Sequence, residues 1–364
     1  MKTRITVLIV VLLFFISGCN LSDNEYQRYN SSFLDTFDTM VQVIAYTPSE
    51  DEFNQYADLI HSRLQNLHKL YDIYNTYEGL NNIKTINDNA GVKPVEVEQE
   101  IIELILFAKD WSEHSNGAVN IALGPVLRIW HDYREEAHYD PGKAELPPLE
   151  TLKTAAEFTN LNLLEVDPEE MTVYLPASEM SLDVGAVAKG FALEIVAREV
   201  ADAGMSSGLI SAGGNIRAVG NPEDSERDRW QIGVQDPDAS IVGGTDRLLD
   251  VILLSNGSVD TSGDYQRYYK INDEIIHHLI DPQTLMPASH YRSVTVVATD
   301  SGVSDFMSTS LFLIPYEESL AMAESHEELE ALWVMSDGEV RTTPGMEQML
   351  QSYGASPEHN EGLE

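Results

Sequence analysis

Residues 181–190 combine small side chains with one acid and one base, a combination suited to binding an anionic ligand. A strand-like end runs into an expected helix start, where unpaired backbone N–H groups attract anions. Gly185 and Ala186 leave the backbone open to a ligand, and Lys189 adds a positive charge. The alternative is that Asp183 only caps the helix and that Lys189 is a surface charge. These residues alone favour neither interpretation.

Asp305 and Thr309 are four residues apart in a segment expected to be helical, so they fall on one face of it. A carboxylate and a hydroxyl side by side are hard oxygen ligands suited to Mg²⁺. An exposed aspartate next to a threonine that bonds back to its own helix is the more common case for such a pair. The pair is therefore a magnesium-site hypothesis that needs further support.

His277 and His278 precede an apolar pair and an Asp-Pro turn. A histidine at the end of a strand could act as a general base. The alternatives are a pair of zinc ligands or a surface histidine. Zinc is disfavoured, because adjacent residues of a strand point to opposite faces and the sequence has no second cluster of Cys and His.

Two further segments are rich in small or polar residues. Residues 117–127 hold two glycines and indicate either a cradle lined by backbone or an ordinary loop. Residues 258–265 carry many oxygens and turn-forming residues without a specific signal. The sequence has no G-x-x-x-x-G-K-[ST] loop, and its glycine-rich residues 212–215 do not match G-x-G-x-x-G. A nucleotide site must therefore be built in another way.

The elements that position these residues are expected to form a single α+β domain, with an antiparallel sheet flanked by helices. Amphipathic spacing predicts helices over residues 53–71, 101–111, 184–203 and 304–313. Strand patterns occur at residues 37–46, in a hairpin at 165–175, and at 207–211, 216–219, 230–235, 248–254, 267–271, 293–298 and 332–335. We expect the domain to cover residues 33–345, with a loop at 140–148 and an acidic tail at 346–364.

The N-terminus has the pattern of a lipoprotein signal peptide covering residues 1–18. Lys2 and Arg4 precede an apolar stretch at residues 5–16 that is too short to span a bilayer as a mature helix. Small residues then precede Cys19, the only cysteine of the chain. An ordinary signal peptide with an incidental cysteine is the alternative. The lipoprotein interpretation predicts lipid on Cys19, a polar tether over 19–32, and a place on the outer side of the cell membrane.

The charge of the chain limits its partners. It has 60 acidic and 22 basic residues, which gives a net charge of −38. Nucleic-acid binding is not expected, because phosphate contacts need clustered Lys and Arg. Adsorption of the protein surface to anionic lipid headgroups is disfavoured for the same reason. We expect a well-solvated surface whose negative charges repel one another.

The order of these segments and the residues in them resemble the ApbE family, the FAD:protein FMN transferases, over about residues 33–314. The patterns D-x-G-[AG]-x-A-K-G at 183–190 and H-x-[IL]-D-P at 278–282 are specific. The other segments that carry the resemblance are 37–39, 117–120, 212–216, 230–237, 261–263 and 305–309. The resemblance implies a Mg²⁺-dependent enzyme that moves FMN from FAD onto a threonine or serine of an exported acceptor flavoprotein and releases AMP.

The resemblance also implies roles for individual residues. His278 would be the base, and Mg²⁺ would be held by Asp305, Thr309 and the main-chain carbonyl of Ala186. Contacts with FAD would come from Phe37, Tyr74, Ala118, Val119, Asn120, Asp183, Lys189 and Leu279. Tyr71 and Tyr77 compete with Tyr74 for the aromatic place against FAD. Two departures stand out: residues 37–39 replace a common Met-Gly-Thr, and Asn120 replaces a common Asp.

Two other functions remain open at this point. An FAD hydrolase would use the same residues with water as the acceptor. A non-enzymatic lipoprotein would bind FAD and never release AMP.

Overall fold

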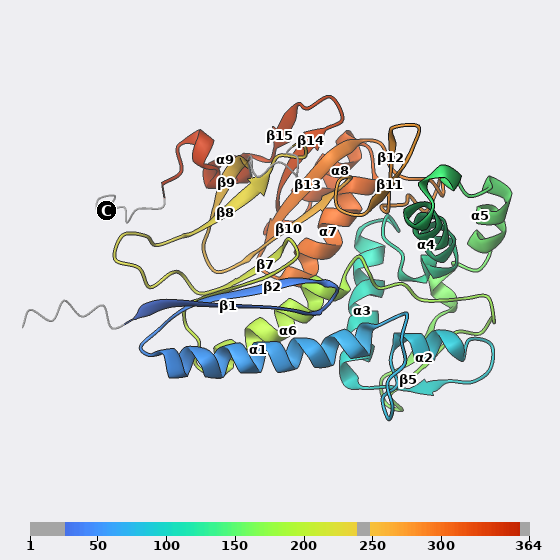
Figure 1. Cartoon of the computed structure of the whole chain (residues 1–364), viewed down its shortest axis with the longest axis horizontal. Helices are drawn as coiled ribbons and strands as arrows, with labels where there is room; N and C mark the ends of the chain where they lie inside the picture. Colours follow the sequence, from blue (N-terminus) through green and yellow to red (C-terminus); the bar gives the residue numbers. More distant parts are fainter. Residues whose placement is uncertain (1–25, 239–247, 357–364) are drawn as a thin grey trace, which may run out of the picture.

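The computed structural model describes residues 26–238 and 248–356, and these form the expected α+β fold (Figure 1). Its centre is an eight-stranded sheet in the order β1-β2-β6-β7-β10-β13-β14-β15, in which every neighbouring pair is antiparallel. The strands are β1 (Gln27–Thr36), β2 (Thr39–Thr47), β6 (Gly208–Ala212), β7 (Asn215–Val219), β10 (Ser258–Gly263), β13 (Tyr291–Ala298), β14 (Glu330–Met335) and β15 (Val340–Thr342).

Three smaller sheets lie around this one. The first contains β3 (Val95–Glu96), β4 (Glu165–Asp167) and β5 (Thr172–Tyr174), of which β4 and β5 form the hairpin predicted at 165–175. The second pairs β8 (Trp230–Gln235) with β9 (Leu248–Leu254), and both strands have the predicted bounds. The third pairs β11 (Tyr268–Ile271) with β12 (Glu274–His277).

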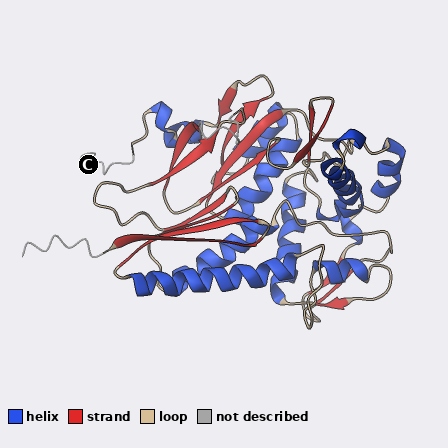
Figure 2. Ribbon diagram, viewed as in Figure 1, coloured by secondary structure: helices blue, strands red, loops and turns tan. Residues whose placement is uncertain are grey.

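Helices α1 (Glu50–Tyr71), α6 (Ala188–Asp202) and α7 (Ser301–Leu313) pack on one face of the large sheet (Figure 2). The apolar positions that predict the α1 helix are buried there, among them Phe53, Ile60 and Leu67. The other helices are α2 (Ile83–Asp88), α3 (Gln99–His114), α4 (Gly124–Tyr139), α5 (Leu149–Ala156), α8 (Tyr316–Glu324) and α9 (Pro344–Met349). In the described part of the chain, no helix has the length and apolar character needed to cross a bilayer.

Helix α7 is the element that most directly positions polar groups inside the fold. Every one of its residues except Val303 is buried, because it lies against β10, β13 and α6 at once. Its serines and threonine therefore find partners within the protein, such as Ser262 of β10, whose hydroxyl lies 2.9 Å from that of Ser308. This arrangement places Asp305 and Thr309 in the wall of a cavity.

Three predicted boundaries are wrong. The helix predicted from residue 184 begins at Ala188, because residues 183–187 form a turn. Residues 258–265, interpreted as turns, contain the central strand β10, whose polar side chains are buried against α7. The loop or cradle at 117–127 ends in a 3₁₀ turn (Ile121–Leu123) and the start of α4.

The predicted tether and tail also need correction. Strand β1 begins at Gln27, so the second half of the tether expected over 19–32 is paired with β2. Its alternating side chains are mostly polar and exposed, and its stability comes from main-chain bonding to β2, which leaves no apolar pattern in the sequence. At the other end, α9 packs against β9 and β14, and Met346 and Leu350 are buried on the second face of the sheet.

Replacing Met346 with alanine is expected to lower the free energy of unfolding by about 2–5 kcal/mol, because the side chain is fully buried. Urea unfolding followed by circular dichroism measures the change. Met349→Ala is the matched control and should cost less, since Met349 is only partly buried. An unchanged unfolding midpoint for Met346→Ala would mean that residues 346–350 add little to the stability of the domain and behave as the predicted tail.

Candidate active site

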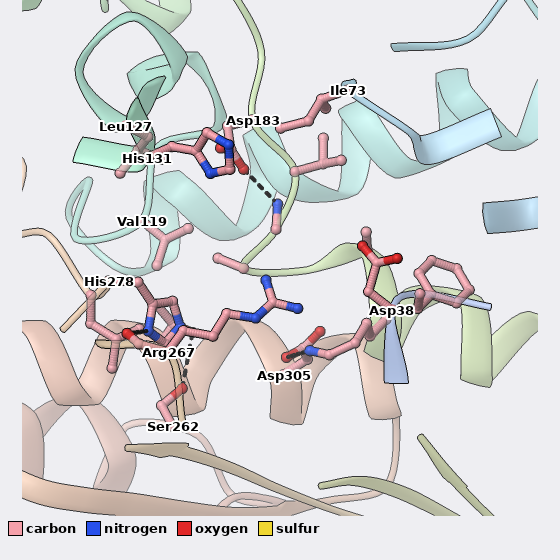
Figure 3. Close-up of a pocket in the computed structure, with 18 of the residues that line it drawn as sticks. Asp38, Ile73, Val119, Leu127, His131, Asp183, Ser262, Arg267, His278 and Asp305 are labelled. Atoms are coloured by element: carbon pink, nitrogen blue, oxygen red, sulfur yellow. Dashed lines mark hydrogen bonds and ion pairs between the residues drawn. The ribbon is translucent and has the colours of Figure 1, made fainter. Parts of the chain in front are cut away.

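A cavity of about 570 Å³ opens where the ends of several elements meet. Its walls come from the β1–β2 turn, the end of α1, the start of α4, the turn before α6, helix α7 and the segments directly before β11 and after β12 (Figure 3). All the predicted FAD, metal and base residues of the described part line it: Phe37, Tyr74, Ala118, Val119, Asn120, Asp183, Ala186, Lys189, His278, Leu279, Asp305 and Thr309. The structure brings these side chains together, while their individual roles remain predictions. Cys19 lies outside the described residues.

Asp183 shapes the turn that precedes α6 and does not cap the helix. Its N–H donates to the carbonyl of Ile121 at 2.8 Å, and its Oδ1 accepts from the Gly185 N–H at 2.9 Å. Loss of solvation raises the pKa of its carboxyl, although the Gly185 N–H and the charge of Arg267 oppose the rise. The capping alternative for Asp183 is therefore wrong, and the exposed Gly185 leaves this turn open to the cavity.

Lys189 and Asp305 form an ion pair on the wall of the cavity, with Nζ and Oδ1 3.9 Å apart. The side chain of Lys189 is 24% exposed and that of Asp305 is 8% exposed, so Lys189 is not a free surface charge. The second oxygen of Asp305, Oδ2, accepts the N–H of Gly190 at 2.8 Å in the first turn of α6. A Cβ at Gly190 would collide with the Ser301 carbonyl, so glycine is what lets α6 and α7 approach this closely.

A second carboxylate lies beneath this ion pair. Asp260 of β10 is buried, and its Oδ2 accepts a hydrogen bond from the Ser304 hydroxyl. Its Oδ1 is buried without a hydrogen-bond partner among the described residues. Burial and then the charge of Asp305 hold the pKa of Asp260 well above its usual range. Asp260 is only 1% exposed and does not line the cavity, so the wall itself presents the ion pair of Lys189 and Asp305.

His278 is held by the main chain of Arg267. The His278 N–H donates to the Arg267 carbonyl at 3.1 Å, and its ring Nδ1 lies 3.2 Å from the same oxygen. Donation to a carbonyl assigns the proton to Nδ1, so Nε2 is left as an acceptor. Burial, and next the charge of Arg267, lower the pKa of His278 to about 3. The ring is therefore neutral at ordinary pH.

His277 has a structural role. Its Nε2 lies 2.7 Å from the Ala288 carbonyl, and its Nδ1 accepts the Leu279 N–H at 3.2 Å. Both ring nitrogens are used by the protein, so His277 has none left for zinc. Within residues 26–238 and 248–356, no group of three or more His, Cys, Asp or Glu side chains is arranged to hold a metal. A cation here would depend on hydroxyl and carbonyl oxygens as well as on a carboxylate.

Comparisons with known proteins identify the family of the chain. The profile of the ApbE family matches residues 37–333. The chain belongs to the ApbE family. It is similar to the FAD:protein FMN transferase of Treponema pallidum, with 31% identity over 72% of this chain and 73% of that protein. It is also similar to a FAD:protein FMN transferase of Klebsiella pneumoniae, with 27% identity over 88% of this chain and 92% of that protein.

The fold agrees as well. The crystal structure of the ApbE protein of Thermotoga maritima has a TM-score of 0.76 at 25% identity, covering 89% of this chain and 99% of that one. The α+β class and the antiparallel sheet predicted from the sequence are those of an ApbE structure.

Among the three tyrosines that compete for the aromatic place in an ApbE site, only Tyr74 offers an open ring. Tyr74 is 54% exposed and packs against His131 with ring centroids 5.0 Å apart. Tyr71 is buried and donates its hydroxyl to the Glu100 carbonyl. Tyr77 donates its hydroxyl to Asp72 and is not part of the cavity wall. The structure therefore favours Tyr74.

Two positions depart from the common ApbE pattern, and the structure gives each a local explanation. Phe37 and Asp38 both have φ of 51°, so the tight turn into β2 uses the left-handed region that a glycine adopts most easily. The Asn120 amide is occupied, because its Oδ1 accepts the Ala122 N–H and its Nδ2 donates to the Thr159 carbonyl, both at 2.8 Å. A ligand would therefore meet the backbone of Asn120 more readily than its side chain.

Besides Lys189 and His278, the cavity of this ApbE protein is lined by basic residues that were not predicted from the sequence, among them His131, Arg134 and Arg267. His131 and Arg134 come from α4, a helix that was not predicted, and Arg267 directly precedes β11. The signal for α4 was the buried spacing of Val126 and Trp130 after Pro125, a residue suited to a first helical turn. Arg267 carried no signal of its own, because its position depends on how the β11–β12 pair folds back.

Proposed function

We propose that this protein is a flavin transferase that moves FMN from FAD onto a serine or threonine hydroxyl of an acceptor protein and releases AMP. The observation that carries the proposal is one cavity that joins a neutral histidine with a free Nε2 to a wall of oxygen donors beside a lysine. The names of the relatives support the same activity.

Mg²⁺ fits the donor set of this cavity. Asp305 and Thr309 supply a carboxylate and a hydroxyl on one face of α7, and Ala186, in the turn before α6, can supply a carbonyl. The carboxylate of Asp305 faces the cavity beside Lys189, and the Oδ1 of the neighbouring Asp260 is a buried oxygen without a hydrogen-bond partner among the described residues, so a cation at this wall would find both oxygens nearby. When bound, Mg²⁺ would neutralise part of the charge on the FAD pyrophosphate.

The chain's own residues can carry out the proton and phosphoryl steps. Lys189 would hold the phosphate oxygens, since the N–H groups of Gly185, Val187 and Ala188 in the turn before α6 already have partners within the protein. His278 Nε2 would accept the proton of the acceptor hydroxyl as its oxygen attacks the phosphorus on the flavin side. The new bond is a phosphoester, and the bond to the AMP oxygen breaks with its electron pair on AMP. The proton on His278 is then released to solvent.

The test is to incubate the mature protein with FAD and Mg²⁺, with and without a threonine-containing acceptor domain, and to measure AMP and the acceptor mass. AMP together with an FMN-sized mass increase on the acceptor is expected. AMP without a mass increase on any acceptor would indicate hydrolysis, with water in place of the hydroxyl. Bound FAD that never yields AMP would indicate a binding protein.

We further propose that the enzyme is anchored by lipid on Cys19 at the outer side of the membrane, where its acceptor would be an exported flavoprotein. The support is the pattern of residues 1–19 and the single cysteine. In cell fractionation, Cys19→Ser should move the protein from the membrane to the soluble fraction. A membrane-bound Cys19→Ser variant would contradict this anchor.

A further inference from the structure

Arg267 is the cation of the cavity that has no partner within the described structure. Lys189 is paired with Asp305, and Arg134 donates to the His131 ring at 2.8 Å. The guanidinium of Arg267 has no hydrogen bond or ion pair to any described side chain, although the cavity also contains several acids. Figure 3 shows it pointing into the cavity, between His278 and Asp305 in that view. A free guanidinium in this position has five N–H donors available to a ligand.

The main chain of Arg267 ties this side chain to the candidate base. Its carbonyl accepts both the backbone N–H of His278 and the ring Nδ1 hydrogen. The guanidinium and His278 Nε2 are therefore anchored by the same residue. Because the charge of Arg267 also acts on the His278 ring, and Figure 3 shows the guanidinium close to that ring, a group bound by Arg267 would lie near the base.

The charge pattern indicates what that group must be. The chain has a net charge of −38. Arg267, which has no partner among the described residues of the cavity, is therefore a local positive charge in a strongly acidic protein. The charge of Arg267 already opposes the rise in the pKa of Asp183 and lowers the pKa of His278. An anion that pairs with the guanidinium would weaken the effect of Arg267 on both pKa values. Two oxygens on one centre, as in a phosphate, match the planar fork of arginine.

We propose that Arg267 binds the non-bridging oxygens of the flavin-side phosphate of FAD and makes that phosphate a requirement for tight binding. The proposal rests on FAD being the substrate of this cavity. In this arrangement Arg267 holds the phosphorus next to the base from one side, while Lys189 and Asp305 lie on the other.

Binding of FAD, FMN and riboflavin in EDTA tests this assignment without turnover, using flavin fluorescence and the full mature chain. Arg267→Gln should weaken FAD and FMN binding by roughly 10- to 100-fold and leave riboflavin binding unchanged. Arg267→Lys should fall between Arg267→Gln and the wild type. Arg128→Gln is the matched control, because Arg128 is exposed on α4 and does not line the cavity.

Several outcomes would overturn the assignment. Equal losses for all three flavins would mean that Arg267 only supports the fold, and unchanged binding would mean that it meets no ligand. A loss confined to FAD would place the guanidinium on the AMP side. A wild-type protein that binds FMN no more tightly than riboflavin would show that the phosphate contributes nothing.

A pH profile gives a readout that a structural role would not move. His278 faces the charges of Arg267 beside β11, His277 of β12 and Arg134 of α4. Arg267→Gln removes one positive charge that lowers the pKa of His278, so the acid limb of kcat/KM should shift to higher pH. The experiments distinguish a failure of this inference from a failure of the proposed function. FAD binding that depends on Arg267 but gives no AMP would contradict only the transferase activity. Full FMN transfer by Arg267→Gln would contradict only the role of Arg267.

Discussion

Replacing His278 with alanine is expected to reduce FMN transfer by roughly 10²- to 10⁴-fold while leaving FAD affinity nearly unchanged. The reason is that Nε2 of His278 is the one ring nitrogen of the pair His277 and His278 that the described protein does not use. Its loss removes the group that takes the proton of the acceptor hydroxyl and leaves the phosphate and flavin contacts in place. Single-turnover AMP release gives the rate, and flavin fluorescence gives the affinity.

His290→Ala is the matched control, because His290 lies outside the cavity wall. Added imidazole should restore part of the transfer in His278→Ala if the lost group is a base. A variant that keeps its rate but loses FAD affinity would make His278 a binding residue. A variant that keeps both would remove it from the mechanism.

The low pKa of His278 raises a question about its strength as a base. A value of about 3 in the free protein means that the ring stays neutral as the pH falls, so kcat/KM should show no acid limb from this group until the pH approaches 3. Such a ring is also a weak proton acceptor. A phosphate paired with Arg267 would cancel the second-largest cause of the shift. We therefore expect the acid limb of kcat to lie at higher pH than that of kcat/KM.

The same shift has a consequence for stability. An unfolded histidine binds a proton near its ordinary pKa, whereas folded His278 does so only near 3. The unfolded state therefore gains a proton first as the pH falls, and the contribution of His278 to stability is lost progressively below about pH 6.5. His278→Ala should make the protein less sensitive to acid in this range.

Elements of the fold could be predicted where apolar residues repeat with a regular period. Elements whose buried residues are polar could not be predicted. Strands β8 and β9 have their predicted bounds, because their alternating or continuous apolar residues end at turns. Strand β10 was missed because Ser258, Asp260 and Ser262 face the interior and bond to hydroxyls of α7. A strand whose polar side chains form hydrogen bonds with a polar helix has no hydrophobic periodicity in its sequence. Only the tertiary structure reveals such a strand.

The site divides in the same way. Asp183, Lys189 and His278 lie in short, specific sequence patterns, and Asp305 and Thr309 lie in a weaker segment that follows them in the family's order, so the sequence selected all five as candidates, and all five line the cavity. Arg267 and His131 could not be found, because each is an exposed or half-buried polar residue whose importance comes only from the cavity that it faces. The Asp260 carboxylate was missed with its strand. The electrostatic surroundings of the predicted residues depend on chain folding over long distances, and no local pattern encodes them.

Replacing Asp305 with asparagine is expected to lower transfer by roughly 10³-fold or more and to abolish most of its dependence on Mg²⁺. Asparagine keeps the shape of the side chain, and its amide oxygen can still accept the Gly190 N–H that joins α7 to α6. It removes the negative charge that faces Lys189 and the cavity. The substitution therefore separates the charge of Asp305 from its structural hydrogen bond. Calorimetric titration with Mg²⁺ or Mn²⁺ measures metal affinity independently of turnover.

Asp132→Asn, on the exposed side of α4, is the matched control for the loss of one negative charge from this acidic protein. It should leave metal affinity and transfer unchanged. Full Mg²⁺-dependent transfer by Asp305→Asn would remove Asp305 from the metal site. Lost transfer with unchanged metal affinity would mean that the carboxylate acts by holding Lys189, and the cation would then have to be sought at Asp260, whose Oδ1 is a buried oxygen that lacks a partner within the described fold. Titrations of Asp305→Asn and of the control Asp132→Asn therefore decide whether the Asp305 carboxylate binds the cation.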